Sequence, residues 1–217
     1  MPQVHLIPVG QFGREVAVQV AQSFDAHISP EQDAGIPSSW PQAAIQVIVS
    51  WREVPWLFSL ADKMAHSLDR PWMPVTLDSK SLRVGPLIAP HHSGCYPCFI
   101  KRQRQHSRLS PTDLELFNHY DANPESGIFG HLPSHVRIAS SLISSSVQAL
   151  LGQSQEGQVP DSSALRVGEL TRVGLTGLNV SRGRLIGVHG CPTCSPDNPD
   201  NTWKSISQLN LSAEKSA

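Results

Sequence analysis

All four cysteines of this 217-residue chain stand in two C-x-x-C pairs, and this pattern limits the fold more than any other feature. Cys95 and Cys98 form the first pair, and Cys191 and Cys194 form the second. Two residues between two thiolates allow one tight turn to present both sulfurs to the same metal ion. Two such turns complete the tetrahedral sulfur shell that zinc prefers. The spacing therefore predicts one zinc ion, held by Cys95, Cys98, Cys191 and Cys194.

The alternatives for these cysteines are a redox motif, ordinary buried thiols or disulfides. A redox C-x-x-C pair usually opens a helix in a thioredoxin-like unit. Here the first pair lies in a Pro/Gly-rich loop after a predicted strand, and the second lies near the C-terminus. Four thiolates leave no open coordination position, so the predicted zinc is structural. His91, His92 and His189 are close to the pairs in sequence and are either alternative ligands or residues around the site.

The composition argues against several classes of function. Seventeen Lys and Arg residues nearly balance eighteen Asp and Glu residues, so no strong charge points to nucleic acid or to a membrane surface. We find no signal peptide and no transmembrane segment in the sequence. We therefore expect a cytoplasmic protein, a location in which thiols stay reduced and disulfides are rare.

The hydrophobic pattern predicts an α/β fold with a mixed sheet in one domain, residues 1–195, followed by a polar C-terminal tail, residues 196–217. A turn-rich segment covers residues 27–41, and a polar linker covers residues 153–162. The motif Ser110-Pro-Thr-Asp113 predicts a helix start. The predicted strands are 4–9, 44–49, 72–77, 82–88 and a hairpin within 165–188 that turns at Ser181–Arg184; the predicted helices are 13–24, 54–68 and 134–151.

The opening motif PVGQFGREV, residues 8–16, resembles the glycine turn of the ThiF-type, Rossmann-like fold found in ubiquitin-activating-type enzymes. The resemblance continues through VGPLIAP at residues 84–90, Ser93–Cys98 with the basic helix after it, and the late pair Cys191–Cys194. In that family the two cysteine pairs bind a structural zinc. Within the superfamily, this combination is most similar to the cyclodehydratase partner proteins of pathways that make thiazole- and oxazole-modified peptides of the bacteriocin or thiopeptide type.

This resemblance implies a partner subunit that is not catalytic alone. Such a subunit binds the leader region of a precursor peptide and delivers the core region to a YcaO protein. The YcaO protein uses ATP to convert Cys, Ser or Thr residues to azolines, with loss of water. The resemblance also implies a homodimer. Because the first predicted strand begins at Val4, we expect no N-terminal winged-helix module, so the leader is bound by this domain or by a separate leader-binding protein.

The glycine turn departs from the pattern of an ATP-binding relative. A working turn reads G-x-G-G-x-G, so that the backbone can approach phosphates. Here only Gly10 and Gly13 remain, and Phe12 adds bulk between them. Asp25 and Asp33 are the candidates for an acidic ribose ligand, both in irregular sequence. We therefore predict a degenerate nucleotide turn that binds no nucleotide cofactor.

Two other functions stay open: an active adenylating enzyme that acts on the C-terminus of a peptide or sulfur carrier, and a zinc-stabilised interaction module. If all four cysteines bind zinc, no thiol remains to form a thioester, and none of the ten histidines lies in a catalytic motif. We therefore expect no catalytic residue. The basic run Lys101, Arg102, Arg104 and Arg108 either faces an acidic leader peptide or forms a solvated helix face. The serine-rich stretch 140–146 suits close helix packing, including packing across a dimer interface.

Overall fold

The computed structural model describes residues 2–30, 40–106, 110–123, 126–127, 129–152, 164–177 and 179–194. The predicted linker 153–162 and C-terminal tail 196–217 lie outside the described residues, as do Asp33 and Arg108. Of the five tryptophans, which the sequence suggests serve packing, Trp203 also lies outside. Among the described residues, no helix is long and apolar enough to span a bilayer.

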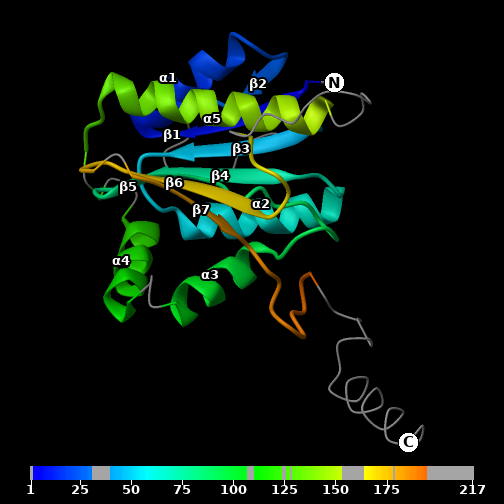
Figure 1. Ribbon diagram of the computed structural model, residues 1–217, viewed down its shortest axis with the longest axis vertical. Coiled ribbons are helices and arrows are strands. Elements are labelled where there is room, and N and C mark those ends of the chain that lie inside the picture. The colour runs from blue at the N-terminus through cyan, green and yellow to red at the C-terminus, as the bar shows by residue number, and fades with distance from the viewer. Residues whose placement is uncertain are drawn as a thin grey trace, which may run out of the picture.

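The described strands form one mixed sheet in the order β2-β1-β3-β4-β5-β6-β7 (Figure 1). The strands β2, β1, β3 and β4 run parallel to one another. From β4 onward, each of β5, β6 and β7 is antiparallel to the strand before it in the sheet. This arrangement confirms the predicted α/β fold with a mixed sheet. The bounds are β1 Val4–Val9, β2 Ala26–Ile28, β3 Ile45–Ser50, β4 Trp72–Leu77, β5 Ser81–Val84, β6 Glu169–Gly174 and β7 Val180–Arg184.

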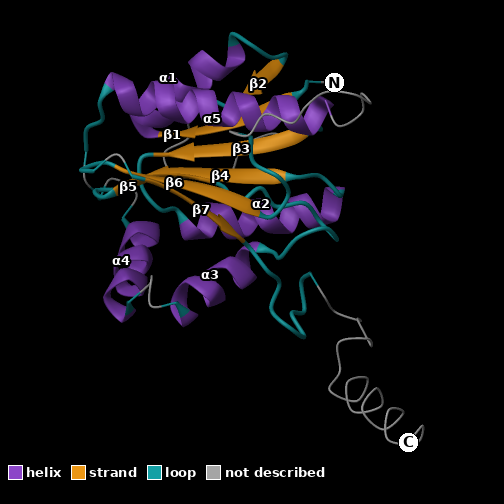
Figure 2. Ribbon diagram, viewed as in Figure 1, coloured by secondary structure: helices purple, strands orange, loops and turns teal. Residues whose placement is uncertain are grey.

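Helices cover both faces of the sheet, because alternate residues of each strand point to opposite sides. On β1, Leu6 belongs to the core under α1 and α5, whereas Ile7 belongs to the core against α2 and α3. Figures 1 and 2 show these two helical layers with the strands between them. The helices are α1 Gly10–Ala21, α2 Pro55–Leu68, α3 Tyr96–Gln105, α4 Pro111–Ala122 and α5 Pro133–Gly152.

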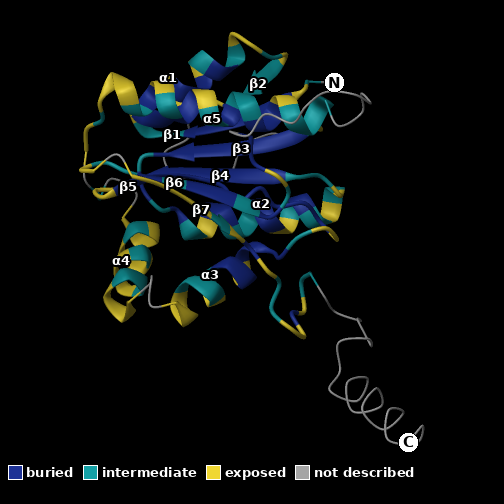
Figure 3. Cartoon of the chain, in the orientation of Figure 1, coloured by how far each residue is buried: buried dark blue, intermediate teal, exposed yellow. Residues whose placement is uncertain are grey.

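The helix α4 begins where the sequence predicts it. Ser110 accepts a hydrogen bond from the backbone of Asp113, and the Asp113 carboxylate accepts one from the backbone of Ser110, which makes a complete capping box. Pro111 occupies the first position, where its missing N–H costs nothing. No residue of α4 is buried, so the cap and not the core explains where this helix begins (Figure 3).

The predicted hairpin turn at Ser181–Arg184 is wrong, because these residues lie inside β7. The chain turns instead after Gly174, whose N–H donates to the carbonyl of Asn179. Gly183 gives Ser-Arg-Gly-Arg the composition of a turn, yet in β7 it lies opposite Leu170 on β6. A Cβ at Gly183 would lie 3.7 Å from Leu170 Cγ, an ordinary packing distance, so no close contact requires glycine at this position.

Two further boundaries differ from the prediction. The segment predicted to be turn-rich overlaps the short strand β2, which pairs with β1 over three residues, Ala26–Ile28. The helix α1 begins at Gly10, directly after β1, and not at Gly13. The glycine turn is therefore as short as a strand-to-helix connection can be, and Gly10 adopts a positive φ of 71° to make it.

The serine-rich helix α5 packs closely within the chain, as its small residues predict. Ser140 lies against α1, where its Oγ is 3.3 Å from Gln19 Oε1, and Ser140 is only 3% exposed. Ser146 accepts a hydrogen bond from the backbone of Leu165 at 3.1 Å. These two buried serines thus serve the internal core, and a role for this helix in a dimer stays a prediction.

Candidate metal centre and glycine turn

The fold brings the four cysteines into one cluster. Their sulfur atoms all lie within 4.8 Å of one another. Cys95 Sγ lies 3.6 Å from Cys98 Sγ and 3.5 Å from Cys191 Sγ, and Cys98 Sγ lies 3.6 Å from Cys194 Sγ. The predicted grouping of the two pairs is therefore confirmed. The distances exceed the roughly 2.05 Å of a disulfide, so the cysteines are free thiols.

The spacing of the sulfur atoms suits a tetrahedral metal ion. With zinc–sulfur bonds of about 2.3 Å, a regular tetrahedron places its sulfur atoms about 3.8 Å apart. The three shortest distances, 3.5–3.6 Å, are slightly smaller, so a small outward shift accommodates the ion. Sulfur donors and tetrahedral geometry together favour zinc or an iron–sulfur site over magnesium or calcium. The cluster is a candidate metal site with the chemistry that the sequence predicts.

Two loops build the site, and glycines let them cross closely. The first loop runs from β5 to α3, and the second continues β7 to the C-terminal cysteine pair. A Cβ at Gly94 would come within 3.0 Å of both the Gly187 nitrogen and Leu185 Cγ, so a side chain at Gly94 would push the loops apart. The backbone N–H of Val188 then donates to Cys98 Sγ at 3.2 Å, as expected for a turn that presents thiolates.

Different surroundings give the cysteines different proton affinities. Burial raises the pKa of Cys95 far above its ordinary value, and burial also raises the pKa of Cys194, to about 11. Burial is likewise the largest influence on Cys191, but hydrogen bonds from the backbone N–H groups of Cys194 and Thr193 outweigh it. They bring the pKa of Cys191 down to about 6. Ionising three buried cysteines and the half-buried Cys194 together is costly without a cation, so a metal ion would supply the charge that lets all four ionise.

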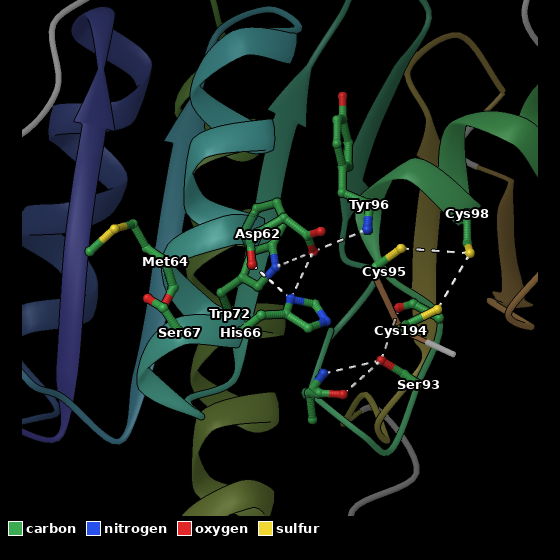
Figure 4. A network of polar contacts seen from close by, with 12 residues as sticks. Asp62, Met64, His66, Ser67, Trp72, Ser93, Cys95, Tyr96, Cys98 and Cys194 are labelled. Atoms are coloured by element: carbon green, nitrogen blue, oxygen red, sulfur yellow. Dashed lines mark hydrogen bonds and ion pairs between the residues drawn. The ribbon is translucent and has the colours of Figure 1, made fainter. Parts of the chain in front are cut away.

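A buried carboxylate, Asp62 of α2, supports the first cysteine pair. Asp62 is 2% exposed. Its Oδ1 accepts hydrogen bonds from the backbone N–H of Tyr96 at 3.0 Å and from Trp72 Nε1 at 3.1 Å (Figure 4). Burial raises the pKa of Asp62, while the Tyr96 N–H, the charge of His66 and the Trp72 N–H lower it. Because Tyr96 is the first residue of α3, the carboxylate fixes the helix start beside Cys95.

The basic helix after the first pair is fastened to the second loop. Arg102 on α3 donates to the carbonyl of Ile186 at 3.3 Å and to the carbonyl of Gly187 at 3.1 Å. Lys101 and Arg104 point to solvent. The sequence suggested that this basic run faces an acidic leader peptide or forms a solvated helix face. Arg102 instead joins the two halves of the metal centre within the chain.

The predicted alternative ligands lie outside the sulfur cluster. His91, His92 and His189 line a groove of about 660 Å³ next to it, together with Arg102 and Arg184. Among the described residues, only the four cysteines group closely enough to hold a metal ion. The histidines are therefore surface residues around the candidate site.

The glycine turn lies at the carboxyl ends of β1 and β3, where the order of the strands reverses and nucleotides bind in open α/β sheets. Here Trp51, which follows β3, lies directly over Gly10. A Cβ at Gly10 would come within 2.1 Å of Trp51 Cδ1. The Trp51 ring also stacks on Phe129 with ring centres 4.7 Å apart, and a Cβ at Gly127 would meet it at 2.3 Å. Trp51 thus fills the space above the turn.

The bulk that closes the turn comes from Trp51 and not from Phe12, as the sequence suggested. Phe12 is 1% exposed and faces the core, because it is the third residue of α1 and lies on the inner side of that helix. Gly13 is needed for packing. A Cβ at Gly13 would lie 2.3 Å from the carbonyl oxygen of Val49, so glycine lets α1 approach β3.

Asp25, the described candidate for a ribose ligand, is at the wrong end of the sheet. Its carbonyl accepts hydrogen bonds from the backbone of Gln3 and Val4, so it lies beside the amino end of β1. The carboxyl end of β2 is followed instead by Ser29, which is 2% exposed and lies 2.7 Å from His5 Nε2. Because parallel strands share their direction, a residue before β2 cannot reach a ligand at the turn after β1.

Sequence reasoning missed three residues of this region: Trp51, Asp62 and Arg83. Arg83 is 2% exposed and pairs with Glu53, while its Nε donates to Thr76 Oγ1 at 3.2 Å. Asp62 carried a usable signal, since it is the one acidic residue on the buried face of α2. For Trp51 and Arg83 the signal is absent, because their partners are remote in sequence.

Comparisons with known proteins agree with this fold. No protein-family profile matches the chain, and no curated protein matches it significantly in sequence. Among solved structures, the heterocyclase TruD matches with a TM-score of 0.63 at 17% identity over 94% of this chain. A heterocyclase in complex with substrate and cofactor matches with a TM-score of 0.63 at 20% identity over 88% of it.

The microcin C7 biosynthetic enzyme MccB of E. coli, solved with AMPCPP and MccA, also matches. Its TM-score is 0.59 at 15% identity, over 89% of this chain and 66% of MccB. The chain spans 31% and 24% of the two heterocyclase chains. At these identities the likeness establishes the fold alone. The expected resemblance to heterocyclase proteins is confirmed at that level, and activity, substrate and partners need their own evidence.

Proposed function

We propose that this chain is a partner subunit of an azoline-forming cyclodehydratase. In this role it binds a precursor peptide, a YcaO enzyme or both, and the YcaO enzyme carries out the ATP-dependent ring closure on Cys, Ser or Thr. The subunit contributes affinity and proximity, which accelerate a reaction without a catalytic side chain of its own. The proposal includes a homodimer and a separate leader-binding protein as further partners.

The observation that carries this proposal is the fold shared with heterocyclase TruD over 94% of the chain, combined with a closed glycine turn. Trp51 lies where a nucleotide phosphate would approach Gly10, since a Cβ there would already meet the ring at 2.1 Å. The described residues directly after β2 are Ser29 and Pro30, and neither is an acid. These features support a chain that keeps the scaffold of the fold without binding ATP.

We also propose that Cys95, Cys98, Cys191 and Cys194 hold one structural zinc ion. Four thiolates would saturate zinc, so the ion would supply a cross-link and no reactive position. The cross-link would join the start of α3 to the segment after β7, at the end of the antiparallel half of the sheet. The protein residues of that region do the rest: Asp62 fixes the helix start and Arg102 holds the second loop.

The test is reconstitution with a YcaO enzyme and a precursor peptide encoded near the gene for this chain. We expect the chain to bind at least one of the two by calorimetry and to accelerate azoline formation, followed as the loss of one water per ring by mass spectrometry. An omission control lacks this chain. A chain that binds neither protein, and leaves the ring-closure rate unchanged, would refute the proposal.

The leading alternative is an adenylating enzyme, which the match to MccB solved with AMPCPP favours. Pyrophosphate exchange and calorimetry with ATP and magnesium separate the two functions. We expect neither exchange nor ATP binding. Clear ATP binding by the isolated chain would establish the alternative, and it would mean that Trp51 moves away from Gly10 in solution.

A further inference from the structure

Within the described residues, no strand pairs with the outer edge of β7, the last strand of the sheet. Leu185 N donates to Gly168 O at 2.7 Å, and Asn179 O accepts from Gly174 N at 2.9 Å, so both residues bond inward toward β6. In an antiparallel pair these inward positions alternate with outward ones. The backbone N–H and C=O groups of Val180, Arg182 and Arg184 therefore point away from the sheet. The described chain places no strand beside them.

The groove of about 660 Å³ next to the metal centre begins at the end of this edge. Its lining includes two arginines, Arg102 and Arg184, and three histidines, His91, His92 and His189. No aspartate or glutamate is among the described residues that line it. The groove is therefore positively charged and rich in hydrogen-bond donors, although the whole chain has a formal net charge of −1.

Two kinds of contact remain unused at this surface. Arg184 is exposed and forms no ion pair or side-chain hydrogen bond with any described residue. Val180 and Ile186, at the two ends of the edge, are large apolar side chains that are 65% and 66% exposed. A segment that offers carboxylates, apolar side chains and an extended backbone would use all of these contacts at once.

We propose that β7 and its groove bind an acidic peptide segment in extended conformation. The segment adds a strand to the sheet by hydrogen bonding to the outward backbone groups of Val180 and Arg184. Its carboxylates pair with Arg184 and accept hydrogen bonds from the groove histidines, and its apolar side chains cover Val180 and Ile186. This proposal rests on the proposed function, since it gives the precursor peptide a docking place on the chain.

The test uses the zinc-loaded 217-residue chain and a fluorescein-labelled peptide of alternating glutamate and valine. We expect saturable binding by fluorescence anisotropy, and no binding of the matched peptide of alternating lysine and valine. Arg184→Glu should weaken binding by about tenfold or more, as expected for reversal of one close charge pair. Arg104→Glu is the matched control, because Arg104 is an exposed arginine on α3 that does not line the groove.

A second comparison separates strand addition from simple charge attraction. The glutamate–valine peptide with N-methyl groups on alternate residues keeps its side chains but loses the hydrogen bonds along one edge. We expect this peptide to lose most of its affinity. Equal binding of the methylated peptide, equal weakening by Arg104→Glu, or equal binding of the lysine peptide would each overturn the proposal. A wild-type dimer that Val180→Lys dissociates would assign the edge to a second copy and would also overturn it.

The experiments distinguish failure of the peptide-docking site from failure of the proposed function. If Arg184→Glu leaves both the peptide affinity and the acceleration of ring closure at wild-type values, the docking site is wrong while the partner role stands. If the chain binds the probe peptide at β7 but has no effect on a YcaO reaction, the partner role is wrong and the peptide site stands.

Discussion

Replacing Cys191 by serine tests how much the candidate metal centre contributes to stability. Cys191 is 1% exposed, and its sulfur lies 3.5 Å from that of Cys95, which is 96 positions earlier in the chain. In the chain-entropy description, a cross-link that closes a loop of this length stabilises the folded state by about 4–5 kcal/mol. Serine is a poor zinc ligand, so Cys191→Ser should lose the metal and most of this stabilisation. The loss is a large fraction of the roughly 5–15 kcal/mol by which a typical domain is stable.

The assay has two readouts on the same purified protein. Zinc content is measured by mass spectrometry of the metal, and the free energy of unfolding is measured by urea titration with tryptophan fluorescence. We expect about one zinc per wild-type chain and much less in Cys191→Ser. Thr193→Ser is the matched control, because Thr193 lies in the same turn and supplies no sulfur. A chelator added to the wild-type chain should lower its stability to that of Cys191→Ser.

Because the four cysteines would share one ion, the cysteine substitutions should not be additive. Cys95→Ser and Cys191→Ser disrupt the same ion, so the double variant should be little less stable than either single variant. A Cys191→Ser chain that retains one zinc, or that unfolds within about 1 kcal/mol of the wild type, would refute a cross-link by four cysteines. Fully additive losses would indicate that the thiols stabilise the fold separately, as ordinary buried residues.

Three further predictions concern the residues around the two sites. Burial, and then the charge of His27, lower the pKa of His5 from 6.5 to about 4. The unfolded chain therefore binds more protons, and stability is lost as the pH falls from 6.5 toward 4. His5→Phe should remove about 2 kcal/mol of the loss between pH 7.5 and pH 5 in urea titrations; parallel curves would contradict this. At the glycine turn, Gly10→Ala and Trp51→Ala should each destabilise. The double variant should lose about 1 kcal/mol less than their sum, because removal of the ring relieves the clash, and a strictly additive cycle would disprove the contact. Finally, Asp62→Leu should cost about 2–4 kcal/mol by leaving the N–H groups of Tyr96 and Trp72 unpaired. Asp62→Asn, which keeps an acceptor, should cost clearly less in the same titration, and equal losses would exclude this role.

The sequence is sufficient for the parts of the fold that depend on local pattern. The run VHLIPV predicts β1, the apolar stripe from Leu57 to Leu68 predicts α2, and the capping box at Ser110 predicts α4. The cysteine spacing predicts the grouping of the four thiols, because each C-x-x-C pair is a local unit and only one geometry satisfies both pairs. For these features, residue propensity, hydrophobic pattern and capping all favour the same structure, so the sequence predicts them correctly.

The rest depends on contacts between remote segments. No local pattern shows that Trp51 lies over Gly10 and against Gly127, since these residues belong to three different connections. The glycine turn looks merely incomplete in sequence, whereas in the structure it is covered. The hairpin predicted at Ser181–Arg184 fails for a related reason: Gly183 indicates a turn locally, but its pairing with Leu170 on the neighbouring strand places it inside β7.

The candidate metal centre and the outer edge of β7 are parts of one structural unit. The chain passes from Arg184 through Leu185 and Gly187 directly to the second cysteine pair. Along this path Val188 N–H donates to Cys98 Sγ, and Gly187 O accepts from Arg102. An ion bound by the cysteines would therefore fix the end of the edge strand and the wall of the groove together.

This connection predicts that metal and peptide binding are coupled. Removal of zinc by a chelator should weaken binding of the glutamate–valine peptide, although no peptide contact involves the metal. Because a ligand that prefers one state also favours that state, the peptide should in turn slow the release of zinc to a chelator dye. The lysine–valine peptide is the control and should leave the release rate unchanged. If the glutamate–valine peptide binds the metal-free and zinc-loaded chains equally, the edge strand is held by its pairing with β6 alone, and the metal serves only the fold.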